Sequence, residues 1–160
     1  MTNLKESAQQ IQGILTQHGL SNKVVEFKEL TRTAQEAADA IGCQVGQIAK
    51  SLIFKGKKSG KPVCIIASGT NRVDEKKVGQ LIGEEIERAD ADFVRQHTGF
   101  AIGGIPPIGF HLEIAPLVDE DLLQYQELWA AAGTPHAVFC IAPADLLRIT
   151  GGKVANIRKL

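Results

Sequence analysis

One lysine stands where a charged side chain needs an explanation. Residues 48–54, IAKSLIF, have the apolar and β-branched composition of a strand. Side chains alternate between the two faces of a strand, so Lys50 shares a face with Leu52 and Phe54, the bulkier and more apolar set. Lys50 therefore either extends its ammonium group from an edge to water, which the residues alone favour, or serves a binding or catalytic purpose.

A stretch rich in glycine and proline is the second candidate. Residues 101–110, AIGGIPPIGF, hold three glycines, two prolines and five apolar side chains, and none of them can act as an acid, base or nucleophile. Glycine lets backbone N–H groups approach a ligand, and proline stiffens the backbone path. The stretch can form a backbone cradle with an apolar wall, although a rigid connection is by itself the favoured interpretation. It matches neither the dinucleotide fingerprint nor a phosphate-binding loop.

The sequence contains no convincing nucleophile or metal-binding motif. Ser51 and Ser68 lack a histidine at a suggestive spacing, and Cys64 and Cys140 lie in apolar segments, where burial disfavours a thiolate. The three cysteines and four histidines are scattered without metal-ligand spacing. We therefore expect a reduced, cytoplasmic protein without a structural metal or a cofactor.

Length and charge limit the class of protein. The 160 residues predict a single domain over 1–160, and 18 basic residues balance 18 acidic ones. Zero net charge argues against a protein that coats nucleic acid along its length, so no DNA partner is expected, but it permits a grip on one RNA end. No apolar run has the length of a membrane span and no signal-peptide core is visible, so no membrane partner is expected.

The elements that would position these residues alternate irregularly. A capping box between Thr33 and Glu36 starts one helix, Gly42 ends it, and the lysine-rich turn 55–61 joins two strands into a hairpin. Helices are predicted over residues 4–18, 33–42, 73–83, 90–99, 119–129 and 143–150, and strands over 23–27, 48–54, 62–68, 111–118 and 137–142. This order predicts an α/β domain built around a mixed, largely antiparallel sheet.

Taken together, five segments resemble a known family. TAQEAADAIG, IAKSLIF, SGTNRVDEKKVGQLIG, TGFAIGGIPPIGF and CIAPADLLRIT follow the order seen in YbaK/ProX-type aminoacyl-tRNA deacylases, which are free-standing relatives of the editing domain of bacterial prolyl-tRNA synthetases. The resemblance extends from about residue 24 to residue 157. It implies a compact domain with a barrel-like mixed sheet flanked by helices. It also implies hydrolysis, in trans, of the ester of a mischarged tRNA such as tRNA-Pro, with the acceptor end as partner and a synthetase as a further candidate partner.

The resemblance also assigns site residues. Lys50 matches the family's lysine, and Gly103 to Pro107 match its Gly-x-x-x-Pro loop, so this loop would cradle the aminoacyl end. Leu30 falls where the family varies a pocket residue, and Thr33, primarily a helix cap, is expected near the pocket. Gly133 matches a glycine before the penultimate strand, where Thr134 or His136 either reach the cleft or form a plain turn. The full expected substrate-binding set is Gly103, Gly104, Ile105, Pro107, Gly109, Leu30, Thr33, Gly133, Thr134 and His136.

A mechanism follows as a hypothesis. Lys50 would orient the terminal phosphate or the reactive end of the substrate, while N–H groups near Gly103 and Gly104 hold the carbonyl. Water activated by the ribose hydroxyl, or the thiol of a cysteinyl substrate, would attack the ester. The loop ends in Gly-Phe-His, where many cysteine-specific members carry a basic pair. Alanine, cysteine, serine, threonine and small non-protein amino acids therefore all stay open.

Two further expectations concern binding. A non-catalytic module that holds tRNA ends, a synthetase or an amino-acid-like ligand is the alternative to an enzyme. For RNA capture, Arg72, Lys76, Lys77 and the lysine turn 55–61 would form one basic edge, and the acidic residues 84–92 would face away from the RNA. Binding to tRNA is expected to be weak and sensitive to salt.

Overall fold

The computed structural model describes residues 6–28, 33–110 and 114–160. Helix α1, Glu6–Gln17, buries Ala8, Ile11 and Leu15, which share one face at helical spacing. Helix α2, Ala34–Ile41, begins at the predicted capping box, in which the Thr33 hydroxyl accepts from the Glu36 N–H group at 3.1 Å. It ends at Gly42, whose φ of 83° is the left-handed conformation that glycine adopts without strain.

Three further α-helices begin and end at residues that the sequence marks. Helix α3 covers Glu75–Ile82 after an Asp74 cap, α4 covers Ala91–Thr98 after an Asp90 cap, and α5 covers Pro143–Thr150 with proline in its first turn. Each is followed by a glycine in the left-handed conformation. None of the helices in the described part of the chain is both long and apolar enough to cross a membrane.

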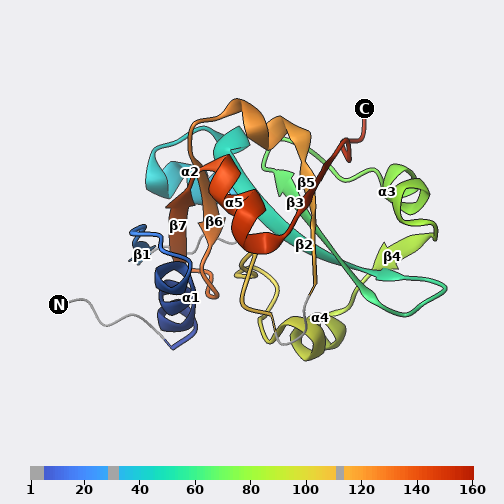
Figure 1. Cartoon of the computed structure of the whole chain (residues 1–160), viewed down its shortest axis with the longest axis horizontal. Coiled ribbons are helices and arrows are strands. Elements are labelled where there is room, and N and C mark those ends of the chain that lie inside the picture. The colour runs from blue at the N-terminus through green and yellow to red at the C-terminus, as the bar shows by residue number, and fades with distance from the viewer. Residues whose placement is uncertain (1–5, 29–32, 111–113) are drawn as a thin grey trace.

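The strands form a mixed sheet, as predicted. They are β1 Val24–Glu26, β2 Ile48–Gly56, β3 Pro62–Ser68, β4 Ile86–Arg88, β5 Leu117–Asp119, β6 Leu128–Ala131, β7 Ala137–Ile141 and β8 Lys153–Ala155. Their order is β1-β7-β6-β2-β3-β5-β8, with β4 on β2. Most paired residues are antiparallel, and β2·β6, β3·β5 and β5·β8 are parallel. The described strands do not close into a barrel, since β1 and β8 remain the two ends of the order (Figure 1).

Strand β2 has one edge that is only partly paired. On one side it pairs with β3 from Ala49 to Lys55. On the other side it pairs with β6 at Ile48 and Ala49, and with β4 from Phe54 onward. Residues 50–53 therefore have no strand partner on this side among the described residues. This opening coincides with a cleft.

The two faces of β2 contribute to different apolar clusters. Ala49 and Ile53 belong to the main core, together with residues of α1, β7 and α5. Leu52 and Phe54, on the face that holds Lys50, pack against a smaller cluster that contains Val78 of α3. Each face of β2 therefore packs on an apolar cluster of its own.

The prediction of a helix over residues 119–129 was wrong. A short 3₁₀ helix covers Glu120–Gln124, with Asp119 as its cap, and β6 follows. In β6, Leu128 and Ala130 are buried while Trp129 and Ala131 are half-buried, so burial alternates with the period of a strand. The strand predicted over 111–118 is shorter, because residues 114–116 are irregular and 111–113 lie outside the described residues. The three-residue strands β4 and β8 were not predicted.

Candidate functional site

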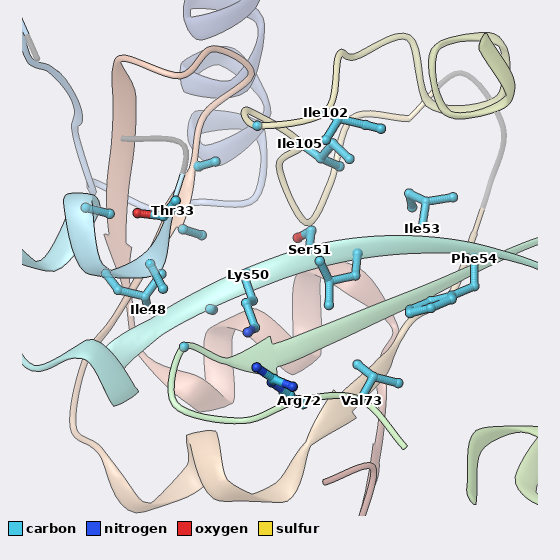
Figure 2. Close-up of a pocket in the computed structure, with 18 of the residues that line it drawn as sticks. Thr33, Ile48, Lys50, Ser51, Ile53, Phe54, Arg72, Val73, Ile102 and Ile105 are labelled. Atoms are coloured by element: carbon cyan, nitrogen blue, oxygen red, sulfur yellow. The ribbon is translucent and has the colours of Figure 1, made fainter. Parts of the chain in front are cut away.

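A cleft of about 1360 Å³ lies at the opening beside β2 (Figure 2). Its walls come from β2, from α2 and its cap, from the segment after β3, from the Gly-Pro loop (residues 101–110) and from β6 and β7. Four of the residues predicted from the sequence line it: Thr33, Lys50, Gly103 and Ile105. The cleft thus brings together segments that are more than half the chain apart.

Strand alternation divides the cleft into two sides. Figure 2 shows the Lys50 side chain pointing toward Arg72, whereas Ser51 points to the side on which Ile102 and Ile105 lie. Lys50 and the Gly-Pro loop therefore line the same cleft from opposite faces of β2. We call these the cationic side and the loop side.

On the cationic side, Lys50 is half-buried beside another positive charge. Burial lowers the pKa of Lys50 below its ordinary value of 10.5, the carboxylate of Asp119 opposes this shift, and the charge of Arg72 adds to it. Neither Lys50 nor Arg72 has an ion-pair or hydrogen-bond partner for its side chain among the described residues. Two unpaired cations in one cleft favour an anionic ligand.

The nearby carboxylates are already engaged. Fully buried Asp119 accepts from the Ser68 N–H group at 3.0 Å and from Asn71 Nδ2 at 2.8 Å. Asp121 accepts from the same amide at 2.8 Å and from Arg158 Nη1 at 3.1 Å. These bonds hold the Asn71–Arg72 segment in place. Among the described residues that line the cleft, Glu75 is the one acidic residue beside the cations Lys50, Arg72, Arg88 and Lys159.

On the loop side, the Gly-Pro loop is a buried structural element. Its residues 104–108 are buried, and Gly103 takes a φ of 103°. A Cβ atom at Gly104 would lie 2.6 Å from the carbonyl carbon of Thr134. The Gly133 N–H group donates to the Gly104 carbonyl at 3.0 Å. The loop and the 133–134 turn therefore support each other.

The remaining predicted residues lie behind or outside the cleft wall. Gly109 packs against Ile11 and Ile14 of α1, and Pro107 is buried without lining the cleft. The His136 N–H group donates to Thr134 Oγ1 at 3.2 Å, and the His136 carbonyl accepts from the Phe27 N–H group at 2.7 Å. His136 thus helps to join the turn to the end of β1. Leu30 lies outside the described residues.

Sequence reasoning missed three groups in the cleft. Arg72 was expected on a surface edge, Ser51 was considered only as a nucleophile, and the walls from β6 were expected in a helix. Arg72 follows β3, which pairs antiparallel with β2, and the β6 wall depends on the parallel pairing of β6 with β2. Spacing along the chain does not reveal the second of these pairings. Among the described residues, no group of three or more His, Cys, Asp or Glu side chains could hold a metal ion.

The cysteines do not contribute a reactive thiolate. Complete burial raises the pKa of Cys64 to about 12. Burial, with the adjacent Glu127 carboxylate, raises the pKa of Cys140 to about 12, and its thiol donates to Glu127 Oε2 at 2.8 Å. None of the cysteines lines the cleft.

Comparisons with known proteins converge on one family. A family model described as the aminoacyl-tRNA editing domain matches residues 28–149. A crystal structure described provisionally as a trans-editing enzyme for prolyl-tRNA synthetase is 46% identical, with a TM-score of 0.92 over 99% of this chain and 100% of that one. Enterococcus faecalis EbsC, provisionally named a Cys-tRNA(Pro)/Cys-tRNA(Cys) deacylase, is 29% identical over 90% of this chain and 89% of its own. A proline–tRNA ligase of Limosilactobacillus fermentum is 32% identical over 64% of this chain and 20% of the ligase.

Proposed function

Because this chain belongs to the aminoacyl-tRNA editing domain family, we propose that it hydrolyses mischarged aminoacyl-tRNA in trans. The expected substrate is a tRNA, foremost tRNA-Pro, that carries a small incorrect amino acid. The observation that carries this proposal is the two-sided cleft at β2. One side holds two unpaired cations, and the other combines an apolar wall with glycine backbone.

The chemistry of an aminoacyl-tRNA end corresponds to these two sides. Its phosphates and ribose are anionic and polar, and they fit the side of Lys50 and Arg72. The short amino acid fits the loop side, where Ile105 and Val138 are among the lining residues. Lys50, near the start of β2, then positions the terminal phosphate so that the ester lies beside Gly103.

Hydrolysis requires little from the protein beyond this placement. Water adds to the ester carbonyl carbon, the carbonyl oxygen becomes an oxyanion, and the bond to the ribose oxygen then breaks. That ribose oxygen leaves with a proton, and the products are the free amino acid and uncharged tRNA. Preorganised N–H donors stabilise such an oxyanion. The Gly104 N–H group already donates to the Ala101 carbonyl at 3.3 Å. We therefore assign the stabilisation of the oxyanion to the Gly103 N–H group.

The proton transfer is assigned to the substrate. The Gly-Pro loop, β6 and β7 contribute residues to the loop side of the cleft. Among the described residues, none of these has an acidic or basic side chain. The neighbouring ribose hydroxyl lies next to the ester in any aminoacyl-tRNA and can activate the water. Editing then rests on proximity and orientation, which can contribute large rate factors without a catalytic side chain.

A deacylation panel tests the proposed function. Purified protein is incubated with tRNA-Pro charged with alanine, cysteine, serine, threonine, 2-aminobutyrate or the cognate proline, and ester loss is compared with buffer alone. EbsC, by its provisional name, is a precedent for a cysteinyl ester. We expect rapid loss of at least one mischarged species and retention of the prolyl ester. Binding of tRNA without any ester loss would instead identify a non-catalytic module.

A further inference from the structure

Ser51 has a hydroxyl group without an explained role. It lies at the opening beside β2, its residue is only 9% exposed, and it lines the cleft. Its Oγ atom is buried and has no hydrogen-bond partner among the described residues. Buried polar groups in native proteins are nearly always paired, so an unpaired hydroxyl in a substrate cleft indicates a ligand partner.

The backbone of Ser51 also faces this opening. The Gly56 N–H group donates to Lys61 on the β3 side, and the Lys57 N–H group donates to Glu85 on the β4 side. Alternate residues of a strand direct their N–H and C=O groups to alternate edges. Ser51 therefore directs both groups away from β3. On that edge, pairing with β6 has ended at Ala49 and pairing with β4 has not begun.

The surroundings limit what can reach Oγ. Ala49 and Ile53 flank Ser51 on the same face of β2, and Ile105 and Val138 also line the cleft. A charged ammonium group is disfavoured in such an apolar environment, because no described acidic side chain lines the loop side. A methyl group would leave the hydroxyl unpaired. A small neutral donor or acceptor fits, once it displaces the apolar atoms that cover Oγ.

We propose that Ser51 determines substrate specificity by hydrogen-bonding the side chain of the amino acid to be removed. This inference rests on the proposed editing function and names its substrate class: short side chains that carry a hydroxyl or thiol, as in serine, cysteine and threonine. A site built around such a bond discriminates against an analogue that lacks it, because the buried hydroxyl is then left unpaired. Alanine is therefore a poorer substrate than serine.

The test compares two esters on one tRNA. The kcat/KM for Ser-tRNA and Ala-tRNA is measured for the wild type and for Ser51→Ala. We expect the wild type to prefer the seryl ester, and we expect Ser51→Ala to lower the ratio of seryl to alanyl kcat/KM by about tenfold or more. An equal effect of the substitution on both esters would overturn the proposal.

Ser68→Ala is the matched control for stability. Ser68 is a buried serine on β3 whose hydroxyl donates to the Gly46 carbonyl at 2.7 Å, and it does not line the cleft. Its loss should lower the melting temperature, because the carbonyl loses a partner. Ser51→Ala should leave the melting temperature unchanged or raise it. A drop as large as that of Ser68→Ala would mean that the Ser51 hydroxyl has a structural partner, which contradicts the proposal.

Binding measurements separate this inference from the proposed function. Hydrolysis-resistant amide analogues of seryl- and alanyl-adenosine are titrated into both proteins. Tighter binding of the seryl analogue by the wild type, equalised in Ser51→Ala, supports the inference even if no ester is hydrolysed. Equal affinities in the wild type reject it even if deacylation is observed.

Discussion

Lys50 owes its chemical character to burial rather than to an ion partner. Half-burial lowers its pKa, and the charge of Arg72 acts in the same direction against the opposing effect of Asp119. The ammonium form is disfavoured in the folded protein, so Lys50 reduces stability below its lowered pKa. This cost is relieved as the pH rises toward the unfolded value of 10.5. A bound phosphate would offset the same cost by supplying a negative charge.

The lowered pKa predicts a pH dependence of binding. The affinity for a short RNA ending in CCA should fall as the pH rises through the lowered pKa, at a lower pH than an ordinary lysine would cause. Lys50→Arg should remove this dependence, because an arginine remains charged throughout the range. Titration by fluorescence anisotropy at constant ionic strength measures both proteins. A pH dependence that is identical in Lys50→Arg would show that another group is responsible.

At the scale of elements, the Gly-Pro loop works through its contact with the turn at Thr134. Ala at position 104 would bring a Cβ atom to 2.6 Å from the Thr134 carbonyl carbon and 2.9 Å from its nitrogen, and backbone cannot easily retreat. We expect Gly104→Ala to lower the free energy of unfolding by about 1–3 kcal/mol and to reduce deacylation by moving Gly103. Urea unfolding and the deacylation rate measure the two effects.

Gly13→Ala is the matched control for this substitution. Gly13 lies inside α1, and a Cβ atom there would meet no atom within 4 Å. This change should stabilise the protein by about 0.5–1 kcal/mol, because alanine loses less backbone entropy in a helix. Similar stabilities for the two variants would mean that the loop does not rest on the turn.

Local chemistry explains which elements could be predicted. The capping box at Thr33, the aspartate caps of α3 and α4, and the β2–β3 hairpin depend on neighbours in the sequence. Strand β6 was mistaken for a helix because its burial pattern comes from pairing with distant segments. It pairs in parallel with β2 and antiparallel with β7. The strands β4 and β8, IER and KVA, were missed because three residues that mix charged and apolar side chains show no strand pattern. Similarly, the resemblance to a family assigned Lys50 and Gly103 to a site, but only strand pairing reveals the open edge at Ser51.

At the scale of the whole molecule, charge is distributed differently from the expected basic edge. Two residues of the acidic stretch 84–92 contact the lysine turn of that expected edge: Lys57 pairs with Glu85 at 3.4 Å, and Glu84 accepts from the Lys58 N–H group at 3.0 Å. The turn is thus partly neutralised. Further cations line the cleft, where Arg88 and Lys159 join Lys50 and Arg72 beside the single described acidic residue Glu75.

This distribution predicts which cation contributes to salt-dependent binding. The affinity for tRNA should be weak and should fall as the salt concentration rises. Arg72→Ala should lower this affinity and reduce the slope of log K against log salt by about one. Lys153→Ala, an exposed lysine on β8 that does not line the cleft, is the control and should leave the slope unchanged. Filter binding at several salt concentrations measures the slope for each protein. A slope unaffected by Arg72→Ala would remove Arg72 from phosphate binding.

The most direct test of the account is deacylation by Lys50→Ala beside Lys153→Ala. Both proteins are compared with the wild type on the mischarged tRNA that it hydrolyses fastest, with circular dichroism to verify folding. The account predicts a loss of about a hundredfold or more for Lys50→Ala with the fold intact, and wild-type turnover for Lys153→Ala. Full activity in a folded Lys50→Ala protein would contradict a reaction centred on the cleft at β2.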